Sequence, residues 1–301
     1  MVDLKKGEIR SSSFINYCAF VTFFPQLIAG PIVRKVTEDT CHIWLVTSLP
    51  SAPSIHLTQR GNNVEVEVEV EYHAESVQVG QYAHIHLLSA AAARKFSDSE
   101  RVYYQLDFTD KAISKKWHIE QQRLLYSAEN SLSFHYTETP ETILHGSCRK
   151  PHFDGDDALA QVDTLIEKGL AGSSSLPDVL LMTGDQIYAD DVAGPMLKAI
   201  HHCCDLLGLY HEGLEGAVVS NTAKLAQHSH GFYEREQLLP QIATNTVLSS
   251  LFFGAKKKPV FTSVNAQNHL IGSAEILAMY FLVWSDALWP LIDIDNNHIP
   301  Q

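Results

Sequence analysis

A cysteine, an aspartate and a tyrosine follow two short apolar runs in the middle of the chain. Cys148 ends the run ILHGSC, and Asp185 and Tyr188 lie just after DVLLMTG. A thiolate, a carboxylate and a phenolate make a strongly anionic ligand set, which favours a Lewis-acidic ion such as iron(III). A bound cation would keep the thiol and the phenol deprotonated. These three side chains are therefore the candidate metal ligands.

The same residue types point to phosphoester chemistry. Asp185 has two carboxylate oxygens, so it could bridge to a second cation. Two cations about 3.5–4 Å apart polarise a phosphoryl oxygen and generate a hydroxide nucleophile. Arg149 lies beside Cys148 and is the candidate for contacting a substrate phosphate. The residues thus predict a metal-dependent hydrolase that acts on a phosphoester substrate.

The elements that must position these residues are a strand, a helix and a second strand. The first apolar run begins at Ile143, and Asp157–Gly172 carries apolar residues at the spacings of three and four typical of a helix. Val179–Met182 predicts a second, buried strand. Strands joined in this way run parallel, and ligands bind beyond their carboxyl ends. Cys148 and Asp185 should therefore meet in space, although about 37 positions separate them.

The chain before this unit predicts an all-β domain. Residues 31–140 contain several short stretches rich in β-branched and aromatic residues, separated by turn signals. Val64–Val70 reads VEVEVEV, so its valines should line one face and its glutamates a wet face. Short strands at this spacing favour a β-sandwich of the immunoglobulin or fibronectin type.

The predicted fold class is α+β, with three parts. Residues 1–30 form an apolar N-terminal segment, residues 31–140 the β-sandwich, and residues 141–301 an incomplete α/β domain. Most of the last hundred residues predict helices, in MLKAIHHCCDLLGLY, in Ala274–Trp284 and in a stretch broken at Pro240. Two histidines and two cysteines are adjacent in the first of these helices. Neighbouring helical residues point about 100° apart, so the four cannot face one ion.

Composition limits the partners. The formal net charge is −13, from 22 Lys and Arg against 35 Asp and Glu. A nucleic-acid surface needs a basic patch, so nucleic acid is not expected as a main partner. An acidic chain still binds a phosphoester if cations supply the local positive charge. The five cysteines are odd in number and two are adjacent, which excludes a disulfide framework.

Residues 14–33 are apolar over about the length of a membrane span. Asn16, Pro25 and Pro31 weaken that interpretation, and the basic start also allows a poor signal peptide. The sequence leaves open membrane association through residues 14–33 and a soluble N-terminal segment. It also leaves open a cytoplasmic or envelope-associated location, and the oligomeric state.

GSCRKPH, then a helix, then PDVLLMTGDQIYADD closely resembles the alkaline phosphatase D (PhoD-like) family of the calcineurin-like metallophosphoesterases. AGPIVRKVTEDTCHIWLVTS resembles the start of that family's N-terminal β-sandwich, and the likeness covers most of residues 29–195. The resemblance implies a cluster of Fe³⁺ and Ca²⁺ and hydrolysis of phosphomonoesters or phosphodiesters. It makes Cys148 the thiolate ligand, Asp185 the bridging carboxylate and Tyr188 the phenolate ligand.

The sequence also departs from that family. An Asn- or Asp-Asp-His-Asp type of motif and later His and Asp ligands, which the family carries in its second half, are not found here. We therefore expect an incomplete active site in the N-terminal part of a metallophosphatase domain. The alternative is a non-catalytic binding or anchoring module with a degenerate phosphatase domain. FFPQLIAGPIVR separately resembles a signature of membrane-bound O-acyltransferases of the alginate-acetylating type, and none of that family's other spans follows.

Overall fold

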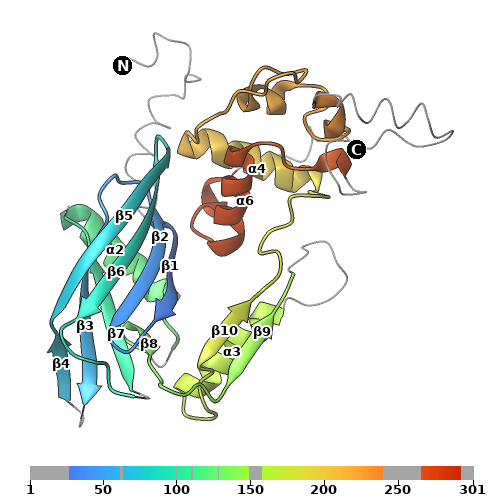
Figure 1. The fold of residues 1–301 in the computed structure, drawn as a ribbon. Helices are drawn as coiled ribbons and strands as arrows, with labels where there is room; N and C mark the ends of the chain where they lie inside the picture. Colours follow the sequence, from blue (N-terminus) through green and yellow to red (C-terminus); the bar gives the residue numbers. More distant parts are fainter. Residues whose placement is uncertain are drawn as a thin grey trace.

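The computed structural model describes residues 27–61, 64–98, 100–109, 111–127, 129–148, 158–239 and 266–292. Within these ranges the chain is a mixed α and β protein, which agrees with the predicted α+β class. Antiparallel sheets occupy the first part of the chain, and helices predominate in the last part (Figure 1). Arg149 lies outside the described residues.

Eight strands form two four-stranded antiparallel sheets. The first sheet has the order β1-β2-β6-β5, and the second has the order β4-β3-β7-β8. The strands are β1 (Leu27–Val36), β2 (Thr40–Thr47), β3 (Ser54–Gly61), β4 (Val64–Val68), β5 (Val70–Gly80), β6 (Ala83–Ala92), β7 (Arg101–Asp107) and β8 (Leu132–His135).

Both sheets contribute to one buried apolar cluster. Its strand residues occupy alternate positions, because successive side chains of a strand point to opposite faces. They are Cys41, Ile43 and Leu45 of β2, Ile55 and Leu57 of β3, Val68 of β4, Leu88 and Ala90 of β6, and Val102, Tyr104 and Leu106 of β7. The alternation read from the sequence is therefore used to bury one face of each of these strands.

The VEVEVEV run is divided between two strands. β4 ends at Val68 and pairs with β3, whereas β5 begins at Val70 and pairs with β6. The chain therefore passes from one sheet to the other at Glu69. Val68 is 2% exposed but Val66 is 40% exposed. The prediction that all four valines line one face is wrong, because the run changes from one sheet to the other before Val70.

A helix interrupts the region predicted to be all-β. Helix α2 spans Lys111–Gln121 and continues into the short 3-10 helix η2, Gln122–Leu124. The segment contains three Lys and two Gln, which have high helix propensity. Its Trp117 is buried and meets Phe108 edge to face, with 6.3 Å between ring centroids. Trp117 thus attaches this helix to the core of the two sheets.

Part of the apolar N-terminal stretch is a strand. Leu27–Val33 belongs to β1, which pairs with β2 through the register Ile32 to Trp44. Residues 14–26 lie outside the described residues. Within the described ranges, no helix combines the length and the apolar character that crossing a membrane requires.

Helix α6 (Ser273–Trp284) lies beside the other face of the first sheet, and helix α4 (Gly194–Leu207) packs against α6 near the end of that sheet (Figure 1). They share a buried cluster with Val46 of β2 and Ala83 of β6. Trp44 meets Tyr280 edge to face at 5.7 Å. α4 ends at Gly208, whose backbone oxygen accepts a hydrogen bond of 2.9 Å from the amide of Gln81, in the turn between β5 and β6. Strands β2 and β6 of the first sheet therefore contribute to apolar clusters on both faces.

The adjacent His201, His202, Cys203 and Cys204 of α4 do not converge, as the helical geometry predicts. Both cysteines are buried in the apolar cluster, and burial raises the pKa of Cys203 to about 12. His201 instead lies 2.7 Å from a carboxylate oxygen of Glu275. The remaining short 3-10 helices are η3 (Thr222–Gln227), η4 (Arg235–Leu238), η5 (Ala266–Asn268) and η6 (Trp289–Leu291).

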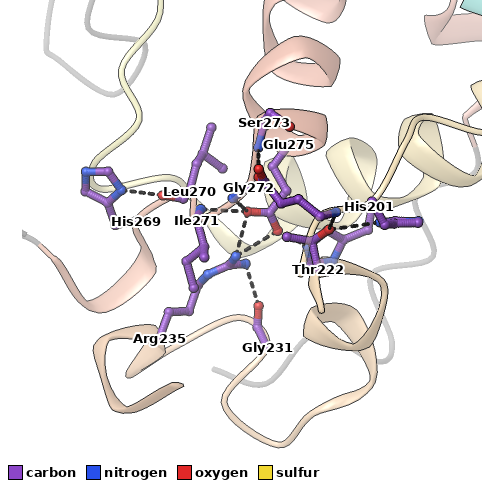
Figure 2. Close-up of polar contacts among 12 residues, drawn as sticks. His201, Thr222, Gly231, Arg235, His269, Leu270, Ile271, Gly272, Ser273 and Glu275 are labelled. Atoms are coloured by element: carbon purple, nitrogen blue, oxygen red, sulfur yellow. Dashed lines mark hydrogen bonds and ion pairs between the residues drawn. The ribbon is translucent and has the colours of Figure 1, made fainter. Parts of the chain in front are cut away.

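A buried ion pair joins η4 to helix α6 (Figure 2). One guanidinium nitrogen of Arg235 lies 2.7 Å from each carboxylate oxygen of Glu275, and another donates to the carbonyl of Gly231 at 2.7 Å. Burial by itself would raise the pKa of Glu275. The hydrogen bond from His201 and the charge of Arg235 outweigh burial and lower that pKa to about 2. Glu275 is therefore held as a carboxylate inside the protein.

The strand–helix–strand unit forms with the predicted elements. β9 (Ile143–Gly146) and β10 (Val179–Met182) are parallel, and α3 (Ala158–Leu170) connects them. The prediction that β10 is buried is wrong: Leu181 is 49% exposed, and Ile143 of β9 is 58% exposed. Among the described residues no third strand pairs with this sheet. Parallel strands are normally covered on both faces, so this unit has much less packing than the two antiparallel sheets.

We expect this difference in packing to appear as a difference in stability. Leu45→Ala in β2 should lower the free energy of unfolding by about 2–5 kcal/mol, because it leaves a cavity in a fully buried core. Leu181→Ala in β10 should change it by no more than about 0.5 kcal/mol, because that side chain is half exposed. Urea denaturation followed by circular dichroism measures both. Equal losses in the two variants would contradict this interpretation.

Candidate metal centre

The carboxyl ends of β9 and β10 bring the predicted residues together. Met182 pairs with Gly146, and the amide of Thr183 donates to the carbonyl of Gly146 at 3.1 Å. Gly184 then lies directly against Cys148. A Cβ atom added to Gly184 would fall 2.5 Å from the Cys148 amide nitrogen and 2.7 Å from its sulfur. The prediction that these two strand ends meet is confirmed.

The sulfur of Cys148 is surrounded by hydrogen-bond donors. The phenol of Tyr188, the hydroxyl of Ser147 and the amide of Asp185 all donate to it, the hydroxyl from 3.6 Å. The hydrogen bond from Tyr188 is the largest cause that lowers the pKa of Cys148. Desolvation by the surrounding atoms and the negative charge of Asp185 act in the opposite direction but are outweighed. The site thus favours a thiolate, which is the form of cysteine that binds metals.

Tyr188 is the donor in the hydrogen bond to the sulfur of Cys148. Its hydrogen bond to Cys148 is the largest cause that raises its pKa to about 12, followed by partial burial and the negative charges of Cys148, Asp185 and Asp190. The thiol of Cys148 therefore ionises at lower pH than the phenol of Tyr188. The phenol keeps its proton and donates it in the hydrogen bond to the sulfur. A cation that bound both atoms would have to displace this proton.

The site is open to solvent. The side chains of Cys148 and Asp185 are exposed, and Tyr188 is partly buried. A second polar pair lies on the same two strands, where the ring of His145 is 2.7 Å from the hydroxyl of Thr183. Sequence reasoning missed this pair, although each residue interrupts an apolar run close to a candidate ligand.

The donor atoms at this site are of types that bind metal cations. The thiol of Cys148 and the phenol of Tyr188 are joined by a hydrogen bond, and the Asp185 main chain donates another hydrogen bond to the same sulfur. Such donors match the anionic set that favours iron(III). Within the described ranges, no group of three or more His, Cys, Asp and Glu side chains is placed to hold a metal ion. The candidate centre contains two side chains of these four types, Cys148 and Asp185. Its third donor is the phenol oxygen of Tyr188.

The candidate centre thus consists of Cys148, Asp185 and Tyr188, held at the ends of two parallel strands and accessible from solvent. The Tyr188 phenol and the Asp185 main chain contact the sulfur of Cys148, whereas the role of the three side chains as metal ligands stays a prediction. Comparison of the chain with protein-family models, with curated proteins and with solved structures found no match.

Proposed function

We propose that this chain is a PhoD-like, metal-dependent phosphoester hydrolase of the calcineurin-like metallophosphoesterase class. The observation that carries the proposal is the contact of Tyr188 and of the Asp185 main chain with the sulfur of Cys148. Two sequence-distant strand ends supply these groups, as the motif order GSC and GDQIY leads one to expect. The proposed ions are Fe³⁺ and Ca²⁺, and the proposed substrates are phosphomonoesters or phosphodiesters.

We also propose the finer architecture that goes with this class. The two four-stranded sheets that share one core would be the N-terminal β-sandwich, of immunoglobulin or fibronectin type, over about residues 31–140. Residues 141–301 would form the N-terminal part of the phosphatase domain. Supporting this division, the candidate ligands all follow residue 141, at the edge of a separate parallel sheet.

Each residue of the candidate centre has a distinct chemical task. Bound cations would polarise a phosphoryl oxygen and lower the pKa of water. Cys148 would supply a thiolate, whose negative charge its three hydrogen-bond donors would stabilise. Tyr188 must release its proton before its oxygen can act as a ligand, so binding of a cation should become tighter as pH rises. Arg149, the next residue after Cys148, would contact the substrate phosphate.

The proposed ligand set is small for two cations. A binuclear site needs more donors than one thiolate, one carboxylate and one phenolate can supply. We therefore propose that this chain binds its metals weakly and turns over slowly by itself. The proposal includes no nucleic-acid partner, because the net charge of −13 opposes one.

The direct test is the metal content of the purified protein. Cys148→Ser and Asp185→Ala should each lower the iron bound per chain at least about tenfold, because each removes an anionic donor. Phosphatase activity on an aryl phosphate, with added iron and calcium, should fall in parallel. Asp205→Ala is the matched control, since it removes an exposed carboxylate from α4. Robust turnover that Asp185→Ala leaves unchanged would refute the proposal.

A non-catalytic binding or anchoring module is the second candidate. The observation that favours it is the exposed apolar surface of β9 and β10, including Ile143, Val179 and Leu180, which a partner could cover. Membrane association through residues 14–33 would belong to this alternative. A purified protein that takes up no iron and no calcium, and that hydrolyses no phosphoester, would support the module over the enzyme.

A further inference from the structure

The main chain that follows Tyr188 is held from outside its own loop. The amide of Leu270 donates to the carbonyl of Ala189 at 2.7 Å. The side-chain amide of Asn268 donates to the carbonyl of Val192 at 2.6 Å. Asn268 is only 9% exposed, so this hydrogen bond is shielded from water. Two hydrogen bonds from a segment about 80 positions away thus fix the loop that begins at Tyr188.

The loop needs this support because its backbone is not relaxed. Asp191 has a φ of 56°, in the left-handed region that residues other than glycine seldom adopt. Such a conformation persists only when the surrounding structure determines it. Ile187 and Ala189, on either side of Tyr188, pack against the apolar cluster of α4 and α6, and Val192 is buried within it. Apolar contacts hold the side chains of the loop against the helical cluster, and the two hydrogen bonds fix its main chain.

The segment that supplies these hydrogen bonds is itself anchored by the buried ion pair. A carboxylate oxygen of Glu275 accepts the amide of Ile271 at 2.8 Å, just after Leu270 (Figure 2). Arg235 and His201 hold that carboxylate from two other elements. A continuous path of hydrogen bonds therefore runs from the interior of the helical part to the loop that carries Tyr188.

We propose that Asn268 is a positioning residue of the metal centre. By holding the carbonyl of Val192, its amide keeps the loop in the conformation that places the phenol of Tyr188 on the sulfur of Cys148. Asn268 does not touch the metal ligands and acts through the main chain. The effect of Asn268 on metal binding rests on the proposed function, but its effect on the position of Tyr188 can be tested without any metal.

The test compares Asn268→Ala with a matched control, Gln59→Ala. Gln59 is also a buried amide, and it exchanges two hydrogen bonds with the backbone of Ser97, far from the site. The protein is labelled with 3-fluorotyrosine, and Tyr188→Phe identifies the fluorine signal of Tyr188 among the 11 tyrosines. In the metal-free protein, Asn268→Ala should shift the Tyr188 signal and Gln59→Ala should not. Iron affinity, read from the phenolate-to-iron absorbance band, should fall roughly tenfold in Asn268→Ala alone.

The outcomes separate this inference from the proposed function. An unchanged Tyr188 signal in Asn268→Ala, or an equal shift in both variants, overturns the positioning role. A shifted signal in a protein that never binds iron supports the positioning role and refutes the metal centre instead. If Asn268→Ala does not fold, as judged by circular dichroism, Asn268→Ser takes its place, because its hydroxyl is too short to reach Val192.

Discussion

Replacing Arg235 by methionine should lower the free energy of unfolding by about 3–5 kcal/mol, because it removes the arginine that pairs with the buried Glu275 carboxylate. Methionine fills much of the volume of arginine, so the loss reports the charge more than a cavity. Urea denaturation at neutral pH measures the change. The double variant Arg235→Met with Glu275→Gln should lose less than the single variant, since no unpaired charge remains.

An exposed ion pair is the control for this prediction. Lys95→Met breaks the contact of Lys95 with Glu38 on the surface and should cost no more than about 1 kcal/mol. Acid provides a second measurement. The folded-state pKa of Glu275 is about 2, below its ordinary 4.5, so its contribution is complete above pH 4.5 and is lost as pH falls toward 2. Glu275→Gln should flatten this part of the stability curve, and a loss in Arg235→Met no larger than in Lys95→Met would contradict the account.

Gly184→Ala should abolish most metal binding while leaving the rest of the protein folded. The new Cβ would lie 2.5 Å from the hydroxyl oxygen of Ser147 and 2.5 Å from the amide nitrogen of Cys148, which is closer than such atoms approach. One of them is backbone, so the end of β9 must move away from the end of β10. We expect iron affinity to fall at least about tenfold, as for changes that displace a ligand. Isothermal titration with iron measures the loss.

Gly213→Ala is the matched control, because a Cβ at Gly213 meets nothing within 4 Å. It adds the same methyl group to the chain and should leave iron binding unchanged. The far-ultraviolet circular dichroism of both variants should match that of the unchanged protein, since Gly184 lies in a lightly packed part of the molecule. Full iron affinity in Gly184→Ala would contradict the prediction, because it would show that iron binding does not require the close approach of Cys148 to Asp185.

Local patterns in the sequence predict the elements better than their packing. Val179–Met182 and the helix before it were found because their apolar spacing is a property of the chain itself. The exposure of β10 could not be predicted in this way, because it depends on whether other parts of the chain cover the strand. Glu69 shows the same limit: nothing in VEVEVEV marks the residue at which the chain leaves one sheet for the other.

The candidate centre divides in the same way. The approach of Cys148 to Asp185 follows from the parallel direction of two strands, which a strand–helix–strand pattern fixes. Asn268 could not be found from the sequence, because its partner is a main-chain carbonyl that any residue at position 192 would offer. A single buried asparagine carries no pattern, and only the fold shows which loop it supports.

Cys148 and Tyr188 lie on parts of the molecule that differ in how tightly they are packed. Cys148 ends a strand with little cover, whereas Tyr188 lies between residues that pack on the helical core. Any ion shared by the two would act as a cross-link and would close a loop of about 40 residues that contains α3 and β10. Such a cross-link would limit local unfolding of the β9–α3–β10 unit, which is the part of the molecule with the least packing. The metal would then be a structural brace for this unit as well as a reagent.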